Sequence, residues 1–199
     1  MSSTSKKAPL QVAGELTRYG IGTFKPNPDR GPVVGILLDV DYLISAALRR
    51  DRMPDFERIA ATIAGPCFCE PTACIADGGG VPATDLERMF VEELGFRVVQ
   101  ASPGAHLVPH LLVEGIRTLQ WPGIEELCVV SRNPDLSVLA QEAALGGQNF
   151  SVARYDWTPS SVLEERASRV ILLGDWHAQK VITFEMTSSA SSARSTRVE

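Results

Sequence analysis

The sequence lacks long apolar runs and has no excess of positive charge. None of its apolar stretches reaches the roughly 18–20 residues that a membrane span needs. The N-terminus, Met1–Lys7, is polar and lacks the apolar segment of a secretory signal. With 19 basic and 24 acidic residues, the formal net charge is −5, which gives no electrostatic footprint for a protein that coats DNA. We therefore expect a cytoplasmic protein with no membrane partner.

Cysteine and histidine are also scarce, with four and three residues respectively. Cys67, Cys69 and Cys74 form a cluster, but zinc sites usually require a wider first spacing and a fourth ligand. No histidine or further cysteine lies close in sequence to supply that ligand. The cluster predicts small apolar residues on a buried strand, and a metal or redox role for it stays open.

What the chain does contain is enough apolar sequence for one sizeable core: 44% of the 199 residues are hydrophobic and 22% are charged. Residues 1–30 mix Ser, Lys, Pro and Gly and predict a flexible N-terminal arm. The Ser-rich residues 186–199 predict a disordered C-terminal tail. Residues 31–185 are then expected to form a single domain.

Within this domain, short apolar runs alternate with helical patterns. Strands are expected at 33–38, 67–76, 96–100, 126–130, 150–154 and 170–173, and residues 181–184 could add an edge strand. Helices are expected at 41–50, 54–64, 85–94, 107–119, 134–145 and 160–167, with Asp41 and Thr84 as N-caps. The alternation predicts a three-layer α/β/α sandwich with a mainly parallel central sheet.

Polar residues follow three of the predicted strands and are expected to share one rim. Asp39 and Asp41 come after the first strand, Ser131, Asn133 and Asp135 follow the strand at 126–130, and Asp175 follows the strand at 170–173. Ligands of such sheets bind beyond the carboxyl ends of the strands. Neighbouring carboxylates raise one another's proton affinity unless a cation is present, and Mg²⁺ takes oxygen ligands. The pattern indicates a metal-dependent phosphoryl or phosphodiester site, although these aspartates could simply cap helices.

Five segments, taken in order, resemble a known family. They are Gly35-Ile-Leu-Leu-Asp-Val-Asp-Tyr-Leu43, residues 86–99, Leu127-Cys-Val-Val-Ser-Arg-Asn-Pro-Asp-Leu136, residues 140–146 and residues 161–173. Together, over residues 33–173, they resemble the NYN domains, a branch of the PIN-like nuclease superfamily. The resemblance implies a PIN-like fold and a metal-dependent ribonuclease that uses Mg²⁺ or Mn²⁺, with RNA as its partner.

The resemblance also implies which residues act. Asp39 matches the first metal-binding Asp of the family, and Asp135 matches the second Asp of its Ser–x–Asp–x–Asp element, so both are expected to be catalytic. The expected metal ligands are Asp39, Asp41, Glu114, Asn133 and Asp135. The metals would position water and neutralise charge on the phosphate.

Several positions depart from the family pattern. Tyr42 replaces an Asn, Asn133 replaces the first Asp of its pair, and Ser168 stands where an Asp is usual. Where the family has its middle acidic residues, this chain has His106, His110 and only Glu114. His110 lies four residues before Glu114, so both side chains would project from one face of a helix, either as a pair of metal ligands or as an ordinary surface pair. Each lost carboxylate weakens Mg²⁺ binding. A catalytically inactive module that binds RNA or a protein partner is therefore the alternative.

A third hypothesis is a haloacid-dehalogenase-like phosphatase. Asp39 would then be the nucleophile and Asp41 the acid/base, with Ser131 and Asp175 as later motifs. No lysine lies between Ser131 and Asp175, and Lys180 comes too late in the order. The sequence leaves homo-oligomerisation open, and the basic residues at 49–52 are expected to be a solvated surface.

Overall fold

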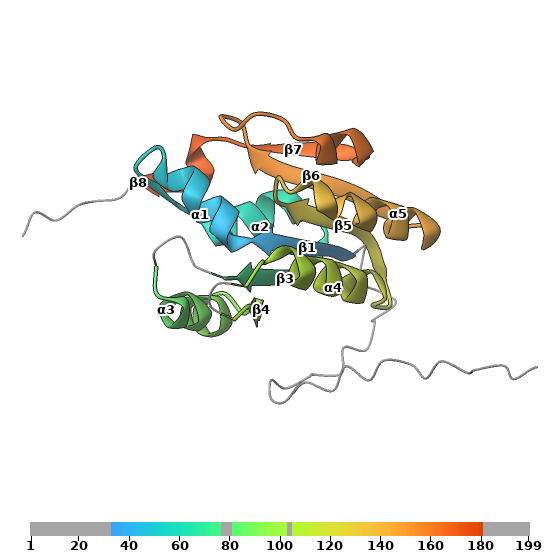
Figure 1. The fold of residues 1–199 in the computed structure, drawn as a ribbon, viewed down its shortest axis with the longest axis horizontal. Helices are drawn as coiled ribbons and strands as arrows, with labels where there is room; N and C mark the ends of the chain where they lie inside the picture. The colour runs from blue at the N-terminus through green and yellow to red at the C-terminus, as the bar shows by residue number, and fades with distance from the viewer. Residues whose placement is uncertain (1–32, 77–80, 103–104, 181–199) are drawn as a thin grey trace, which may run out of the picture.

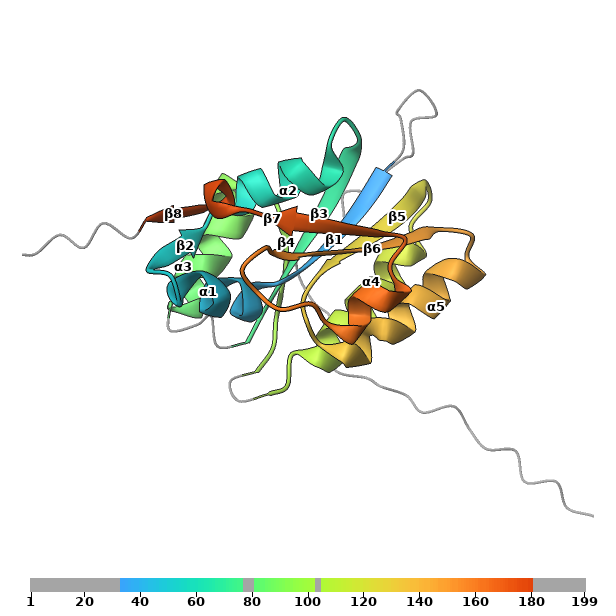
Figure 2. The same cartoon turned by 90° about the horizontal axis from the view of Figure 1, so that it is seen from above.

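The computed structural model describes residues 33–76, 81–102 and 105–180. The predicted N-terminal arm, C-terminal tail and edge strand at 181–184 lie outside these described residues. Within them, a six-stranded sheet lies between layers of helices, which confirms the predicted three-layer α/β/α sandwich (Figures 1 and 2).

The central sheet has the strand order β4-β3-β1-β5-β6-β7, and every neighbouring pair is parallel (Figure 1). Its strands are β1 (Val33–Asp39), β3 (Phe68–Ile75), β4 (Arg97–Gln100), β5 (Ile124–Val130), β6 (Asn149–Tyr155) and β7 (Arg169–Leu173). All carboxyl ends of these strands therefore lie along one edge of the sheet.

Helices cover both faces of the sheet, with α2 on one side and α4 and α5 on the other (Figure 2). The α-helices are α1 (Val40–Leu48), α2 (Phe56–Ala64), α3 (Ala83–Arg88), α4 (Val108–Leu119) and α5 (Ser137–Leu145). A π-helical turn, Met89–Glu93, continues α3, and 3-10 helices span Pro134–Leu136, Val162–Arg166 and Asp175–His177.

The strand β1 is buried on both faces, which explains its continuous apolar sequence. Ile36 and Leu38 belong to the core beneath α1, α2 and α3, whereas Leu37 belongs to the core beneath α4 and α5. All three side chains are at most 1% exposed. The polar residues that end β1 are therefore held by a strand anchored from both sides.

Two predicted N-caps are wrong. Helix α1 is capped by Asp39 instead of Asp41, because β1 runs one residue beyond the predicted end and the Asp39 carboxylate accepts a hydrogen bond from Tyr42 N at 3.0 Å. Helix α3 begins at Ala83 after Pro82, so Thr84 lies inside its first turn and caps nothing. The predicted stop at Gly95 agrees with the structure, where Gly95 has a φ of +66°.

Two other predicted helices are divided or tightened. The segment 134–145 is a 3-10 turn followed by α5, with Asn133 as the cap of the turn. The segment 160–167 is only the 3-10 helix Val162–Arg166, in which Ser161 N donates a hydrogen bond to Glu164 Oε1 at 2.8 Å.

A second, two-stranded antiparallel sheet was not predicted. It joins β2 (Arg52–Pro54) to β8 (Ala178–Lys180), and it takes the place of the first residue of the helix expected at 54–64. Arg52 extends its guanidinium to the carbonyl oxygens of Asp175 and Ala178 at 2.8 and 3.1 Å. Each strand is only three residues long and partly polar, so neither shows an alternating pattern.

His177 anchors this second sheet to α2. Its side chain is buried, with Nδ1 at 3.1 Å from the carbonyl oxygen of Gly174 and Nε2 at 3.0 Å from Thr62 Oγ1. A carbonyl oxygen only accepts hydrogen bonds, so Nδ1 carries a proton. Burial lowers the pKa of His177, which favours the neutral form in which Nε2 accepts from the threonine hydroxyl. The structure therefore holds His177 as the neutral imidazole.

We expect the free energy of unfolding to fall as the pH drops below about 6.5, in part because of His177. Burial lowers the pKa of His177 from its ordinary value of 6.5, so the unfolded chain takes up a proton more readily than the folded one. This stabilisation is complete above the unfolded pKa and is lost as the pH falls. Urea unfolding between pH 5 and 7.5 measures it.

The control for this prediction is the exposed His106. His177→Gln should show a shallower decline of stability below pH 6.5 than the native chain, while His106→Gln should keep the native decline. An unchanged decline in His177→Gln would contradict the assignment.

Candidate functional site

The strand order reverses at β1, because β3 and β4 lie on one side of it and β5, β6 and β7 on the other. In open parallel sheets, such a reversal opens a crevice at the carboxyl ends of the two central strands, and ligands bind there. Asp39 ends β1 and Ser131 directly follows β5. The fold thus brings two of the predicted site residues to this point.

Asp39 and Ser131 are in direct contact across the two strands. The Ser131 hydroxyl donates a hydrogen bond to Asp39 Oδ2 at 2.7 Å, and Tyr42 N donates to Oδ1 at 3.0 Å. Ser131 is only 1% exposed, so its hydroxyl has a fixed environment. Each oxygen of the Asp39 carboxylate is oriented by one donor and keeps a lone pair for another partner.

The charge on Asp39 is costly without a further partner. Burial raises the pKa of this carboxyl group above its ordinary value, and the neighbouring Asp41 adds to that rise. The hydrogen bonds from Tyr42 and Ser131 oppose it but are the weaker influence. A cation at the β1–β5 crevice would stabilise the ionised form.

Asp41 lies on the same rim but is held on the other side of β1. Its Oδ1 accepts a hydrogen bond at 3.3 Å from the backbone N–H of Ala76, which directly follows β3. The two carboxylates are close enough for Asp41 to influence the pKa of Asp39. Asp39 is thus tied to the β5 side and Asp41 to the β3 side of the crevice.

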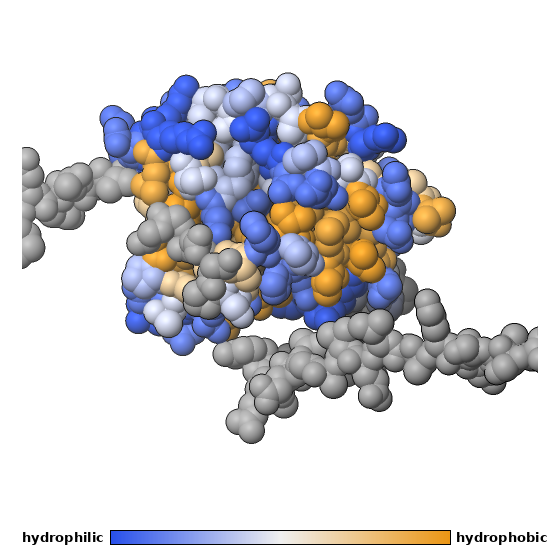
Figure 3. Space-filling view, in the orientation of Figure 1, coloured by the Kyte–Doolittle hydropathy of each residue, from blue (hydrophilic) through white to orange (hydrophobic). Residues whose placement is uncertain are grey.

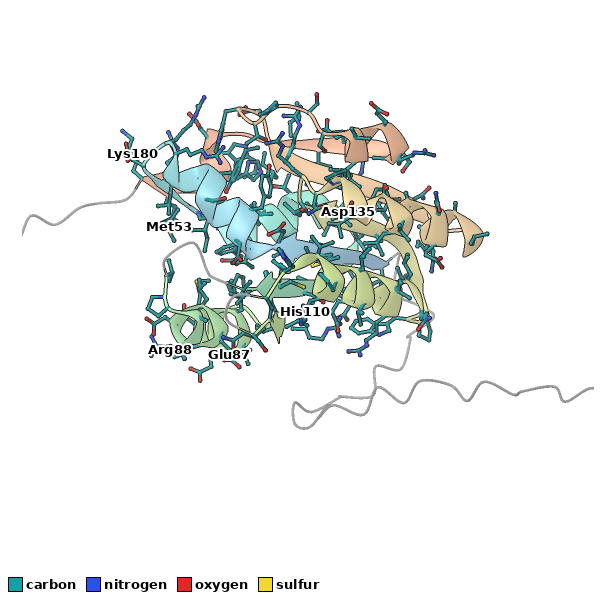
Figure 4. All side chains as sticks on the ribbon, in the orientation of Figure 1. Met53, Glu87, Arg88, His110, Asp135 and Lys180 are labelled. Carbon is teal, nitrogen blue, oxygen red and sulfur yellow. The ribbon has the colours of Figure 1, made fainter. Side chains whose placement is uncertain are left out.

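Asn133 and Asp135 lie on the turn that follows β5. Asn133 N donates to Ser131 Oγ at 3.2 Å, and the Asn133 amide oxygen accepts from Asp135 N at 3.0 Å. The amide oxygen of Asn133 therefore caps the 3-10 helix, a structural role. The Asp135 side chain is exposed at the start of this helix, below the N-terminal end of α5 (Figure 4).

Glu114 is already neutralised by arginine. Its side chain is 6% exposed on α4, with Oε2 at 2.6 Å from Arg97 Nη1 and Oε1 at 2.9 Å from Arg117 Nη1. Arg97 also donates to Thr72 Oγ1 and stacks over Trp121, with 4.8 Å between its guanidinium carbon and the ring centroid. Glu114 therefore connects α4 to β3 and β4, which is a structural task.

The cysteine cluster does not converge on one point. Cys67 and Cys69 are half-buried against the core beneath α1, α2 and α3, whereas Cys74 is buried in the core on the opposite face of the sheet. All are free thiols. The prediction of apolar packing agrees with these positions.

Sequence reasoning missed a polar connection behind Asp39. Tyr42 Oη and Thr158 Oγ1 are 3.2 Å apart, and Thr158 Oγ1 donates to the carbonyl oxygen of Tyr155 at 2.7 Å. Next to them, the rings of Tyr155 and Trp157 stack with centroids 4.2 Å apart. Tyr42 thereby joins α1 to the loop after β6. No sequence spacing indicates such a contact.

The residues of the phosphatase hypothesis are dispersed. Asp175 follows β7, three strands from β1 in the sheet order, and it pairs with Arg52 at 3.3 Å and Arg50 at 3.8 Å. Lys180 ends β8 at the far side of the second sheet (Figure 4). Of that set, only Asp39, Asp41 and Ser131 lie near β1, and Asp175 lies at the far end of the same sheet edge.

The donors at the crevice suit a hard cation only in part. Among residues 33–76, 81–102 and 105–180, no three His, Cys, Asp or Glu side chains are grouped so that they could hold a metal ion. Mg²⁺ in proteins is often held by one or two carboxylates together with substrate phosphates and water. The oxygens of Asp39 and Asp41 fit that partial role, and would hold such an ion with the help of a phosphate ligand.

Comparison with known proteins adds information on the fold. No protein-family model matches the chain, and no curated protein matches its sequence. Nowhere in the described ranges does the chain form a helix long and apolar enough to cross a membrane. A crystal structure of a protein of unknown function from Vibrio parahaemolyticus is similar, with a TM-score of 0.61 and 15% identity over 77% of this chain and 99% of that one. This chain and the Vibrio protein therefore share an α/β fold.

Proposed function

We propose that this chain is a metal-dependent ribonuclease of the NYN/PIN-like type with a reduced active site at the β1–β5 crevice. The observation that carries the proposal is the contact between Asp39 Oδ2 and Ser131 Oγ at 2.7 Å, at the point where the strand order reverses. A half-buried carboxylate with oriented oxygens is suited to positioning a divalent cation, either Mg²⁺ or Mn²⁺.

Each residue at the crevice has a distinct role in this proposal. Asp39 and Asp41 supply the negative charge, and Ser131 fixes the orientation of the Asp39 carboxylate. A bound divalent cation would neutralise charge on the scissile phosphate and activate water. Asp135, exposed on the turn that follows β5, is a further carboxylate on the β5 side of the crevice.

The proposed active site is reduced because two of the expected metal ligands, Glu114 and Asn133, have structural roles. The charge of Glu114 is compensated by two arginines, and the Asn133 amide oxygen caps a helix. With the remaining carboxylates, metal binding should be weak until RNA phosphate oxygens complete the coordination.

We expect purified protein to cleave RNA with Mg²⁺ or Mn²⁺ and not with EDTA, and Asp39→Asn to reduce the rate by about 100-fold or more. The substrate is a mixture of single-stranded and structured RNA. Asp85→Asn, an exposed acid in the first turn of α3, serves as the matched control and should cleave at the native rate. Cleavage by Asp39→Asn at the native rate would show that Asp39 is not part of the active site.

The second candidate is a module that binds RNA or a protein partner without cleavage. The neutralised Glu114 favours it, because a carboxylate expected among the metal ligands is unavailable. Fluorescence anisotropy with labelled RNA, recorded in EDTA, separates the two candidates. Binding without cleavage under any metal condition would support the module and exclude the nuclease.

A further inference from the structure

The outer face of α4 is apolar along most of its length. Leu112 and Ile116 are half-buried, and Val113 is 55% exposed. Glu114, the one acidic residue of this helix, points inward to its arginine partners. A continuous hydrophobic area covers this part of the molecule (Figure 3). Apolar patches of this kind usually mark a contact surface.

A pocket of about 170 Å³ adjoins this face at the N-terminal end of α4. It is lined by Val99, Pro109, His110, Val113 and Glu114. The His110 side chain, labelled in Figure 4, is half-buried, and its Nδ1 atom is enclosed by the protein. A cavity of about 150 Å³ can hold a benzene molecule. The pocket thus has room for one aromatic ring and is mainly apolar.

The first half of β1 lies beside α4. Gly35, in this part of β1, packs against Thr118 near the C-terminal end of α4. Residues 1–32 therefore join the described part of the chain at one end of the apolar face. Within them, residues 16–24 read Leu-Thr-Arg-Tyr-Gly-Ile-Gly-Thr-Phe and contain both aromatic residues of that part of the chain, Tyr19 and Phe24.

The connecting residues are long enough for contact with this face. Residues 25–32 include three prolines, and proline-rich chain extends by about 3.1 Å per residue, which gives a reach of about 25 Å. Helix α4 has 12 residues and a length of about 18 Å at roughly 1.5 Å per residue. The segment 16–24 can thus reach from β1 to the pocket.

We propose that residues 16–24 of this chain bind across the outer face of α4, with the Tyr19 ring in the pocket. Leu16 and Ile21 would cover Leu112, Val113 and Ile116. The ring would gain apolar contacts with the pocket lining. The inference does not depend on the proposed ribonuclease activity.

Hydrogen exchange of the full chain, followed by mass spectrometry, tests the proposal. In the native protein, the amides of residues 16–24 should exchange about tenfold or more slowly than the unprotected rate. Val113→Glu places a charge on the α4 face and should abolish that protection. Val91→Glu, at a 42% exposed position on the opposite helix layer, is the matched control and should preserve it.

Tyr19→Ala should also abolish the protection, whereas Tyr19→Phe, which keeps the aromatic ring, should preserve it. The amides of β1 and β5 report whether each variant remains folded. Unprotected exchange of residues 16–24 in the native protein would overturn the proposal. So would protection that rises with protein concentration together with a doubled mass in light scattering, because a second copy would then cover α4.

Discussion

Gly35→Ala is expected to lower the free energy of unfolding by about 1–3 kcal/mol, and the melting temperature by about 2–12 °C. Gly35 lies on the buried central strand β1, and a Cβ atom there would overlap Thr118 Cγ2 on α4. The helix must shift or Thr118 must change rotamer, and both disturb a close-packed layer. Urea and thermal unfolding, followed by circular dichroism, measure the loss.

Thr118→Ser tests the cause. Serine lacks Cγ2 but keeps the hydroxyl that donates to the Glu114 carbonyl oxygen at 2.8 Å. Alone, Thr118→Ser should lower the free energy of unfolding by about 1 kcal/mol, because one buried methyl group is lost. Combined with Gly35→Ala it should recover about 1 kcal/mol or more, because the new methyl occupies the vacated space. Simple additivity of the two losses would show that the overlap is not responsible.

Glu114→Gln is expected to destabilise the protein by about 2–3 kcal/mol and to leave RNA cleavage at the native rate per folded molecule. The Glu114 side chain is 6% exposed and pairs with Arg97 and Arg117, which are 30% and 38% exposed. Losing the carboxylate leaves both arginines without a counter-charge. Their partial exposure keeps the cost below the roughly 3–5 kcal/mol of a fully buried pair.

The control is Glu142→Gln, an exposed acid on α5, which should change stability by less than about 0.5 kcal/mol. A loss of cleavage in folded Glu114→Gln, measured in the same assay as Asp39→Asn, would instead place Glu114 in the metal site. Asp39→Asn and Glu114→Gln should thus show complementary effects, the first on activity and the second on stability.

The central sheet was predictable because buried parallel strands have continuous apolar sequences. The runs at 33–38 and 126–130 became β1 and β5, each slightly longer than expected. Strands β2 and β8 could not be predicted, since three-residue strands have too few residues to form a pattern. The predicted N-caps were wrong for a local reason. Asp39 at the end of β1 and the proline at position 82 hold the N-cap positions of α1 and α3, each two residues before the predicted cap.

The candidate site was predictable only where it depended on strand ends. Asp39 and Ser131 meet because their positions follow from the strand order. The partners of Glu114 were not predictable, because Arg97 is brought to α4 by the pairing of β3 with β4. The contact of Tyr42 with Thr158, more than a hundred residues apart, depends in the same way on tertiary packing.

The two buried thiols lie on opposite faces of one sheet, and this gives the protein a pair of internal reporters. Cys74 lies beneath α4 and α5, and Cys128 beneath α1 and α2. Burial raises the pKa of Cys128 to about 12 and that of Cys74 further still, so neither forms the reactive thiolate while the fold is closed. Alkylation can proceed only through transient opening of the layer above each thiol. Rates measured separately at the two cysteines would therefore show whether the two helical layers open together or independently.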